Sequence, residues 1–265
     1  MLSKMDDKFV LRDDATGKVI SMDYSDEIER SNRNDLIRHL RECPIPDHSI
    51  LSSLGLFFSS KTMSRLLFMH EFYKKAVDIQ GQVFDFGTRW GQNMALFIAF
   101  RGMYEPFNRH RKIVGFDTFS GFPSLSAEDG KSEMIGLGNI FVSDNYYEYL
   151  DSLLGVLEKN NSLPHLKNYE LVQGDATKTI KKYFEDNPYA LVSHAYFDFD
   201  LYEPTKVCLE TILNHSSLGA VIGFDELNDQ DSPGETLALL EVLGVRKVKV
   251  QRMPWVSRVS FVVLE

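Results

Sequence analysis

Cysteine is scarce in this sequence. Only Cys43 and Cys208 occur among its 265 residues, and no Cys-x-x-Cys spacing is present. A disulfide framework or a zinc site held by thiolates is therefore not indicated, because both need several cysteines at short, regular spacings. We interpret the two cysteines as ordinary buried or half-buried thiols.

Excess positive charge and long apolar runs are also missing. Acidic residues outnumber basic ones by 38 to 29, which gives a formal net charge of -9 at pH 7. Such a chain would repel the phosphates of a nucleic acid, so we expect no nucleic-acid partner. The longest dense apolar segment, residues 94–100, is too short to cross a bilayer. We therefore expect a soluble, cytoplasmic protein with no membrane partner and a small-molecule substrate.

The first 80 residues differ from the rest in their pattern of polar and apolar residues. Residues 1–25 are polar, of mixed charge and rich in turn formers, which predicts a poorly ordered arm. Amphipathic patterns over residues 26–43 and 60–79 predict helices. The sequence thus divides into an N-terminal arm and helical extension, residues 1–80, and one larger domain, residues 81–265.

From residue 82 onward, short apolar runs alternate with amphipathic segments, which is typical of β-α-β units around a parallel sheet. The predicted strands are residues 82–87, 112–117, 169–175, 190–198, 219–226, 246–253 and 257–265, and the predicted helices are residues 91–104, 144–160, 177–186, 204–215 and 234–243. Only a few residues join the last two strands, so these two must pair antiparallel. The sequence predicts an α/β protein with the seven-stranded, mostly parallel sheet of the Rossmann-like methyltransferases, closed by a C-terminal antiparallel hairpin.

Two glycines follow the first predicted strand. The stretch DFGTRWGQN places Gly87 and Gly91 directly before a helix, where glycine permits a sharp turn and the helix N-terminus offers free N–H groups. This pattern favours a cofactor cradle, although a purely structural turn would use the same glycines. It differs from GxGxxG, which weakens the hypothesis of an NAD-linked oxidoreductase.

Acidic residues end the next two predicted strands. Asp117 ends the second, where a carboxylate can accept hydrogen bonds from both ribose hydroxyls, and Asp175 ends the third, beside the expected place of an adenine ring. Each aspartate alone could be a helix cap, but the ordered set favours a nucleoside-containing cofactor. The predicted cofactor contacts are Phe86, Gly87, Thr88, Arg89, Gly91, Asn93, Asp117, Thr118, Phe119, Asp175 and Ala176.

The link between the second and third predicted strands, residues 118–167, is unusually long. Long connections in compact domains are often lids or binding loops. Its aromatic residues are candidates for covering a ligand, and packing of the loop onto the sheet is the alternative. These residues are Phe119, Phe122, Phe141, Tyr146 and Tyr147.

Carboxylates end the fourth and fifth predicted strands. Asp198 ends one, in DFDLYEP, and Asp225 with Glu226 ends the other, in GFDEL. Neighbouring parallel strands would bring these three together, and oxygen ligands of this kind suit Mg²⁺. The alternative is that Asp198 and Asp200 cap the helix that begins near Pro204, which for Asp200 is the favoured interpretation.

Gathered carboxylates and a cation suit the transfer of a methyl group to a hydroxyl. A hydroxyl is a poor nucleophile until it loses its proton, and a cation with a nearby carboxylate assists that loss. The methyl donor would be S-adenosylmethionine, and we predict Asp198 as the base as well as a metal ligand. His194 lies inside a strand, so we interpret it as a packed, hydrogen-bonded histidine.

These residues resemble a known family, the macrocin O-methyltransferase-like enzymes. They are Mg²⁺-dependent methyltransferases that act on sugars of natural products such as macrolides and aminocoumarins. The resemblance spans roughly Gln82 to the C-terminus and is carried by FGTRWGQN, VGFDTFSGFP, FDFDLYEPT and GFDEL. It implies that Asp198, Asp225 and Glu226 are the metal ligands, that Asp198 is a general base, and that Asp117 binds the ribose.

The sequence departs from that family at two positions. Phe199 replaces a small glycine beside the metal ligands, and Glu226 replaces the commoner second aspartate. Neither change removes a carboxylate, so they affect the expected shape of the acceptor more than the reaction. The N-terminal helices resemble the variable region that covers the acceptor and forms dimer contacts in such enzymes, so we expect a homodimer or higher homo-oligomer.

Three hypotheses therefore follow from the sequence. The leading one is a methyltransferase that uses S-adenosylmethionine and Mg²⁺ on a hydroxylated acceptor, for which the family resemblance implies a glycoside. The second is an NAD-linked oxidoreductase on a related sheet, and the third is a binding protein that keeps the cofactor fold without turnover.

Overall fold

The structure, a computed structural model, describes residues 9–265. The N-terminal extension contains β1 (Phe9–Arg12), β2 (Val19–Asp23), α1 (Glu27–Arg41), α2 (Asp47–Ile50), the 3-10 helix η1 (Leu51–Phe57) and α3 (Ser60–Lys74). The rest of the chain contains β3 (Gln82–Phe86), α4 (Gln92–Tyr104), β4 (Ile113–Asp117), the 3-10 helix η2 (Ala127–Asp129), α5 (Tyr146–Lys159), β5 (Tyr169–Gln173), α6 (Ala176–Asp186), β6 (Val192–Phe197), α7 (Tyr202–Leu213), β7 (Ser216–Phe224), α8 (Gly234–Val242) and β8 (Ser260–Val263). All the predicted helices are present.

The main sheet has the strand order β5-β4-β3-β6-β7-β8. The first five strands in this order pair parallel, and β8 pairs antiparallel with β7. Every residue of β3 and β6 is buried, as expected for central strands with helices on both faces. The predicted fold class, a Rossmann-like α/β sheet with an antiparallel C-terminal edge, is confirmed.

One predicted strand, residues 246–253, is reduced to a single bridge. Gln251 pairs antiparallel with Phe261, so within residues 9–265 the main sheet has six strands rather than seven. Most of the side chains in residues 245–250 are exposed. Pairing at this edge would therefore bury little apolar surface, and its lysines favour an edge that stays open to water.

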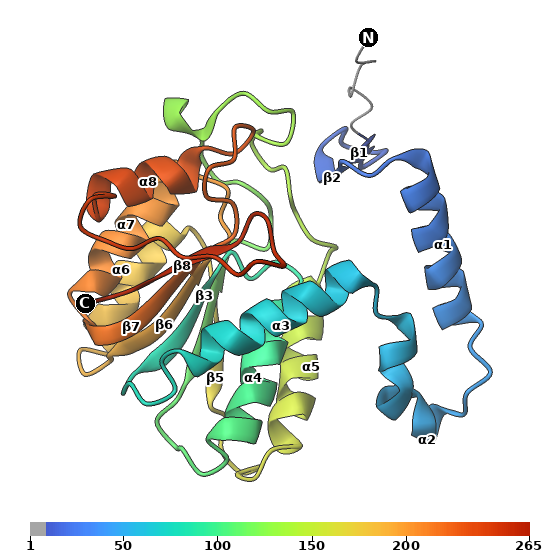
Figure 1. The fold of residues 1–265 in the computed structure, drawn as a ribbon, viewed down its shortest axis with the longest axis horizontal. Coiled ribbons are helices and arrows are strands. Elements are labelled where there is room, and N and C mark those ends of the chain that lie inside the picture. Colours follow the sequence, from blue (N-terminus) through green and yellow to red (C-terminus); the bar gives the residue numbers. More distant parts are fainter. Residues whose placement is uncertain (1–8) are drawn as a thin grey trace.

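Helices cover both faces of the sheet. Figure 1 shows α6, α7 and α8 on one face and α3, α4 and α5 on the other. Phe68 and Phe72 of α3 are fully buried in the core beneath α4, so this helix of the extension is part of the main body. Cys208 is buried and Cys43 half-buried, as predicted, and neither is in a disulfide. Among the described residues no helix combines the length and apolarity that a bilayer crossing requires.

The region preceding α1 is more ordered than predicted. Residues 9–23 form a β-hairpin instead of a loose arm, while residues 1–8 lie outside the described residues. The Asp13 carboxylate accepts hydrogen bonds from the amide and hydroxyl of Thr16, both at 2.7 Å, which closes the turn. Val19 is fully buried, and its carbonyl accepts a hydrogen bond of 2.7 Å from the Ile140 amide. Apolar burial and pairing with the long loop therefore hold the hairpin.

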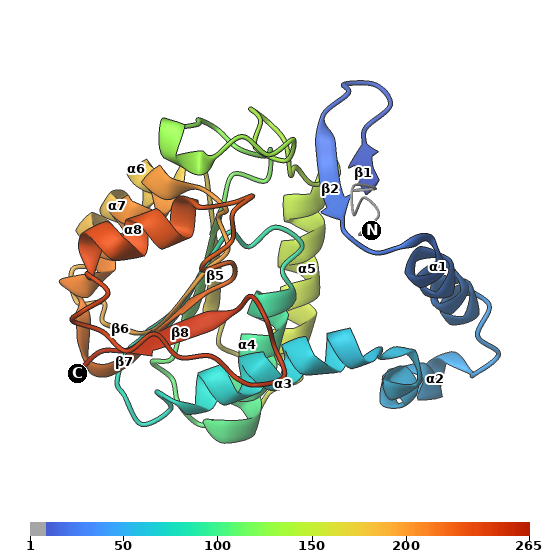
Figure 2. The same cartoon turned by 45° about the horizontal axis from the view of Figure 1, so that its top comes forward.

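The helices α1, α2 and η1 stand away from the sheet, beyond the hairpin, as Figures 1 and 2 show. Within the described part of the chain, none of their residues is buried. Several of their large apolar side chains are exposed, including Ile28 at 71%, Leu51 at 77% and Leu56 at 67%. From here on, the arm means residues 27–57, which contain α1, α2 and η1, and not the loose segment expected at residues 1–25. Much of the arm's apolar surface is exposed to solvent within the described chain.

His194 is a packed core residue, as predicted. It is fully buried, its Nε2–H donates to the Tyr73 carbonyl at 2.7 Å, and its Nδ1 lies 2.8 Å from the Ser193 hydroxyl. The ring also stacks on Tyr73 with centroids 4.9 Å apart. Burial favours the neutral ring and lowers the pKa of His194 to about 3.

We expect His194 to make folding sensitive to acid. Its pKa of about 3 in the folded state lies below the ordinary value of 6.5, so only the unfolded chain binds a proton between these values. The free energy of unfolding should therefore fall as the pH drops below about 6.5, by up to about 1.4 kcal/mol per pH unit from this residue. Urea titrations between pH 5 and 8 measure the slope. His194→Gln should flatten it, and His48→Gln, at an exposed site on the arm, should not; equal slopes in both variants would contradict the assignment.

Candidate active site

A cavity opens at the carboxyl ends of β3, β4, β5 and β6. Its empty volume is about 750 Å³, solvent at the mouth included. That volume lies within the range of small-molecule and cofactor sites. The cavity is lined by Gly87, Arg89, Asp117, Thr118, Gly121, Phe122, Pro123, Ser124, Ile140, Gly174, Asp175, Ala176, Thr177, Asp198, Phe199, Asp200, Leu201 and Pro204.

Gly87 allows two strand ends to meet at this cavity. It has a φ of +85°, and a Cβ built there would lie 2.0 Å from the Asp198 carbonyl oxygen. The Asp198 amide donates to the Phe86 carbonyl at 2.8 Å, and this hydrogen bond also holds the end of β6 against the end of β3. A side chain at position 87 would therefore force β3 and β6 apart.

Asp117 organises the rim of the cavity. Its Oδ1 accepts a hydrogen bond from the Phe119 amide and its Oδ2 one from the Arg89 amide, both at 2.7 Å. Burial raises the pKa of Asp117, although these amides oppose the shift. Each carboxylate oxygen has a second lone pair, so the group can still accept hydrogen bonds from a ligand.

Arg89 links the cavity to the N-terminal hairpin. Its guanidinium donates to the Ile20 carbonyl at 2.6 Å, and its buried Nε has no hydrogen-bond partner among the described residues. Arg89 also lines the cavity, so this buried, unpaired donor belongs to a residue of the cavity wall.

Asp175 has two roles at the end of β5. Its carboxylate accepts a hydrogen bond from the Thr177 amide at 3.0 Å and so caps α6, and the same residue lines the cavity beside Ala176. Both interpretations that the sequence left open, cap and cavity residue, therefore describe its position.

Five predicted cofactor contacts do not line this cavity. Phe86 stacks between Phe116 and Phe197 in the core, and Thr88 is buried with its hydroxyl on the Asp85 carbonyl. The others are Gly91, which precedes α4 with a φ of +75°, Asn93, which donates to Asp85, and Phe119, which packs on Tyr147. These residues shape the turn and the first part of α4 around the cavity.

The aromatic residues of the long loop divide into two groups. Phe122 lines the cavity. A separate hollow beside the N-terminal hairpin is lined by Phe119, Phe141, Tyr146 and Tyr147. Their role in covering a ligand stays a prediction, but only Phe122 of the set is in position to touch a molecule in the first cavity.

Three carboxylates meet next to the cavity. Asp198, Asp225 and Glu226 each offer an oxygen, and these oxygens lie within 4.8 Å of one another. Glu226 is 1% exposed, yet its Oε1 has no hydrogen-bond partner within residues 9–265. An all-oxygen set with an unpaired buried acceptor fits Mg²⁺. The structure thus brings together the residues that the sequence predicts as metal ligands.

Two arginines that the sequence analysis missed balance this group. Arg65, on α3, pairs with Asp225, lies 3.6 Å from Asp198 and donates to the Tyr196 hydroxyl at 2.8 Å. On the other side, Arg258 lies 3.2 Å from Glu226. No spacing rule could connect Arg65 to a strand end 160 residues away. The only feature of the sequence that could have indicated a buried ion pair is that Arg65 lies on a helix face otherwise rich in apolar residues.

The arginines and burial act in opposite directions on the carboxylates. Burial and repulsion from Asp225 raise the pKa of Asp198 well above its usual value, and Arg65 only partly opposes this. Burial would also raise the pKa of Asp225, but Arg65 and the Tyr196 hydroxyl hold it below its usual range. Burial and then Asp200 raise the pKa of Glu226. The group therefore holds protons more tightly than separate carboxylates would, except at Asp225.

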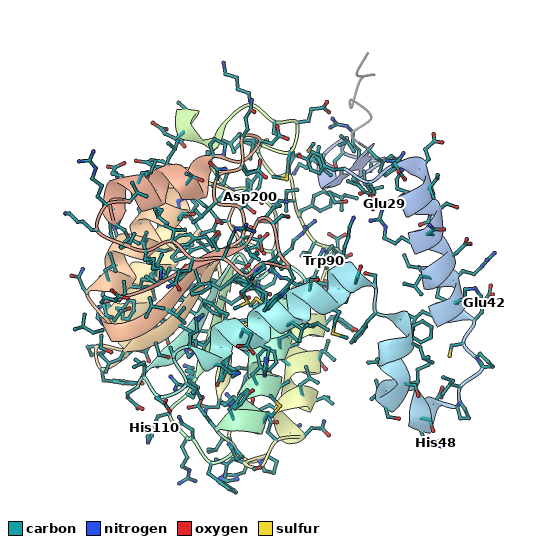
Figure 3. The ribbon with its side chains drawn as sticks, in the orientation of Figure 1. Glu29, Glu42, His48, Trp90, His110 and Asp200 are labelled. Carbon is teal, nitrogen blue, oxygen red and sulfur yellow. The ribbon has the colours of Figure 1, made fainter. Side chains whose placement is uncertain are left out.

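Asp200 does not cap α7, and neither does Asp198, so the cap interpretation was wrong. The helix begins at Tyr202, and the Tyr202 amide donates at 2.6 Å to Asp129, a residue of the long loop. Asp200 has a left-handed φ of +60° and lines the cavity. Figure 3 labels Asp200 near the start of α8. Because Asp129 supplies the cap, the Asp200 carboxylate is not engaged by the first turn of α7 and lies at the cavity wall.

Solved structures identify the relatives of this chain. One, described as CalS11, a calicheamicin methyltransferase, has 34% sequence identity and a TM-score of 0.88 and covers 90% of this chain and 93% of its own. The apo structure of CalS11, described as a TDP-rhamnose 3′-O-methyltransferase of calicheamicin biosynthesis, has 32% identity and a TM-score of 0.80, with coverage of 90% and 95%. The chain belongs to this family of sugar O-methyltransferases.

Other comparisons give less information about the family of this chain. The O-methyltransferase NovP has 16% identity and a TM-score of 0.57 over 76% of this chain and 80% of its own, which supports the fold alone. No family model matches the sequence, and no curated protein matches it significantly. The assignment to the sugar O-methyltransferases thus rests on the CalS11 structures.

We expect Arg65 to be the internal counter-ion of this methyltransferase's carboxylate group. Arg65→Gln should lower the free energy of unfolding in EDTA by about 2–4 kcal/mol, because it leaves buried carboxylates unbalanced. Added Mg²⁺ should then stabilise the variant more than it stabilises the unaltered protein. Thermal unfolding with and without Mg²⁺ measures both effects.

Arg12→Gln is the matched control for that experiment. Arg12 pairs with Glu133 at 2.6 Å, but both side chains are largely exposed. Its replacement should cost no more than about 1 kcal/mol and leave the Mg²⁺ effect unchanged. An Arg65 variant that responds to Mg²⁺ no more than the Arg12 variant would argue against the counter-ion role.

Proposed function

We propose that this chain is an S-adenosylmethionine- and Mg²⁺-dependent enzyme that methylates a hydroxyl of a deoxysugar or glycoside in natural-product biosynthesis. The proposal rests on Asp198, which belongs both to the cavity lining and to the three-carboxylate group. A methyl donor in the cavity and a cation among the carboxylates would therefore meet at one residue. The description of one relative as a TDP-rhamnose 3′-O-methyltransferase supports a sugar acceptor.

The cavity residues fit the proposed cofactor. Asp117 would accept hydrogen bonds from the ribose hydroxyls, Ala176 would pack against the adenine, and Arg89 offers its unpaired Nε–H. S-adenosylmethionine supplies a sulfonium methyl group that an oxygen nucleophile can attack. Gly87 holds the chain close to Asp198, so the methyl-donor and carboxylate ends of the site stay adjacent.

The three carboxylates would hold the metal. Asp198, Asp225 and Glu226 supply oxygens, and Arg65 and Tyr196 orient Asp225 by binding its Oδ1. Mg²⁺ supplies positive charge that favours the deprotonated acceptor. The proposed role of the metal rests on the oxygen donors of this chain and on the unpaired Glu226 Oε1.

The reaction transfers one carbon and one proton. The acceptor oxygen attacks the methyl carbon, the S–CH₃ bond breaks as the O–CH₃ bond forms, and the hydroxyl proton passes to a carboxylate. The products are a methyl ether and S-adenosylhomocysteine. Asp198 is the proposed proton acceptor, because it lines the cavity and also belongs to the three-carboxylate group, where the acceptor hydroxyl would lie.

Asp200 is a second candidate for the proton. It lines the cavity without capping α7, and burial raises its pKa as well. Unlike Asp198 it is not in the three-carboxylate group, so its charge is not committed to a metal. Variants of the two residues distinguish these roles.

The competing hypotheses have less support. An NAD-linked oxidoreductase would need a phosphate-binding turn of the GxGxxG type, which the DFGTRWGQN stretch does not have. A binding protein without turnover would not need three carboxylates close together and partly unpaired. Detection of methyl transfer would exclude both.

We also propose that the arm forms a homodimer contact and contributes to covering the acceptor. Its exposed apolar side chains on α1 and η1 would be costly in a monomer, and a second copy is the partner that is always present. Figure 3 labels Glu42 and His48 at the far end of the arm, well away from the sheet.

Asp198→Asn should lower methyl transfer at least about 100-fold, because it removes a ligand and a proton acceptor together. The assay follows S-adenosylhomocysteine formation over a panel of TDP-deoxysugars and glycosides, with and without EDTA. Asp186→Asn, at an exposed carboxylate of α6, is the control. Full activity in Asp198→Asn would refute the proposed site. If Asp200→Asn keeps Mn²⁺ binding but loses turnover, the proton goes to Asp200.

The dimer proposal predicts that charge on the arm yields a monomer. The double variant Ile28→Asp, Leu51→Asp should elute as a monomer in size-exclusion chromatography with light scattering, because it places two carboxylates in the apolar contact. Leu218→Asp is the control, since Leu218 is 72% exposed but lies at the start of β7. A dimer in the double variant, or a monomer in the unaltered protein, would exclude the arm as the interface.

A further inference from the structure

The turn of residues 198–201 carries two of the aspartates that line the cavity, Asp198 and Asp200, yet it has no regular secondary structure. Asp200 adopts a φ of +60° there, a conformation that a non-glycine residue takes only at some cost in energy. Contacts from other parts of the chain must therefore hold the turn. Two buried carboxylates that the proposed reaction does not use provide these contacts.

Glu235, at the start of α8, ties this turn to the neighbouring strand end. It is fully buried, its Oε1 accepts from the Phe199 amide at 3.1 Å, and its Oε2 accepts from the Glu226 amide at 3.5 Å. Phe199 follows one predicted metal ligand and Glu226 is another. One side chain thus fixes the backbone at both of the strand ends that supply the ligands.

Asp129, in η2, fixes the other end of the turn. It is 1% exposed, its Oδ1 accepts from the Tyr202 amide at 2.6 Å, and its Oδ2 accepts from the Ser126 amide at 2.6 Å. It therefore caps α7 and at the same time binds the long loop to the turn. Both oxygens of each carboxylate are used on backbone amides, which leaves them poorly placed to act on a substrate.

Close packing of α8 completes the support. A Cβ at Gly234 would lie 2.5 Å from the Tyr202 amide nitrogen, 2.6 Å from the Leu201 carbonyl carbon and 2.8 Å from the Asp200 carbonyl oxygen. The first residue of α8 thus rests directly on the backbone of the turn. Such contact leaves no room for the turn to move towards the helix.

We infer that Glu235 and Asp129 are positioning residues, which hold the 198–201 turn so that Asp198 and Glu226 converge on one cation and Asp200 faces the cavity. The inference rests on the proposed metal site. At metal centres, residues that do not touch the metal often orient its ligands through hydrogen bonds, and their loss typically weakens metal binding about 10–100-fold. Glu235 and Asp129 would have this role here.

Binding of Mn²⁺, measured by electron paramagnetic resonance, tests the inference in the full-length protein. Mn²⁺ prefers the same oxygen ligands as Mg²⁺ and is directly observable. Glu235→Gln should weaken Mn²⁺ binding at least about tenfold, because an amide has one acceptor oxygen for two backbone donors. Asp129→Asn should weaken it in the same direction for the same reason.

Loss of a negative charge near a cation would itself weaken binding, so a neutral variant is needed. Gly234→Ala adds only a methyl group, which must displace the turn because of the contacts at 2.5–2.8 Å. It should weaken Mn²⁺ binding while S-adenosylhomocysteine still binds with unchanged stoichiometry, which shows that the protein is folded.

Two controls match these variants. Glu241→Gln alters another α8 carboxylate that contacts α7, through Lys206 at 2.7 Å, but on the exposed side. Gly155→Ala alters a glycine of α5 whose Cβ would meet only the Tyr169 hydroxyl, at 3.3 Å. Both should bind Mn²⁺ as the unaltered protein does.

The outcomes separate the two proposals. If the unaltered protein binds no Mn²⁺, the metal site is refuted and the positioning role with it. If it binds Mn²⁺ and folded Gly234→Ala binds equally well, the metal site stands and the positioning role is overturned. Should Glu235→Gln fail to fold, Gly234→Ala and Asp129→Asn still decide the question.

Discussion

The contact between the ends of β3 and β6 is the constraint on which the rest of the site depends. Gly87 lies so close to the Asp198 carbonyl that a Cβ would be 2.0 Å from it. The strand order reverses at this point, since β4 follows β3 on one side while β6 lies on its other side. Open α/β sheets bind ligands where the order reverses, because the two connections leave in opposite directions and a crevice opens. A carboxylate at the end of β6 is therefore held at the cofactor cavity by the backbone itself.

Bringing acidic groups to such a point has an electrostatic cost, and the fold contains the means to offset it. Asp198, Asp225 and Glu226 meet there, with Asp200 close enough to raise the pKa of Glu226. Arg65, on α3, pairs with Asp225 and so offsets part of this negative charge. The helix α3 of the N-terminal extension therefore contributes both to the site and to the hydrophobic core. Buried ion pairs of this kind rarely add stability, but removal of one partner is costly. The arginine is thus best understood as the condition that lets the carboxylates stay buried.

Much of the fold could be predicted from the sequence, because parallel sheets read as apolar runs that end in polar residues. Asp117, Asp198 and Asp225 were found in this way, since the carboxyl ends of parallel strands share one edge. The cap of α7 could not be found, because Asp129 reaches it from a loop some 70 residues earlier and Asp200 satisfied the local cap pattern better.

The same limit applies elsewhere in the chain. The hairpin of residues 9–23 was missed because its order comes from burial of Val19 against the long loop, which composition alone does not report. The strand predicted at residues 246–253 is reduced to one bridge for the opposite reason. Its alternating valines and lysines have the period of a strand, but pairing there would bury little apolar surface. In both segments tertiary contacts decided against the local pattern.

The long loop after β4 gains a physical explanation from these contacts. Phe122 and Ile140 line the cavity, Asp129 caps α7, and the Ile140 amide binds the carbonyl of Val19 in the N-terminal hairpin. One connection therefore touches the cavity, the turn that carries Asp198 and Asp200, and the N-terminal extension. The length of the loop thus follows from the number of parts that it has to reach.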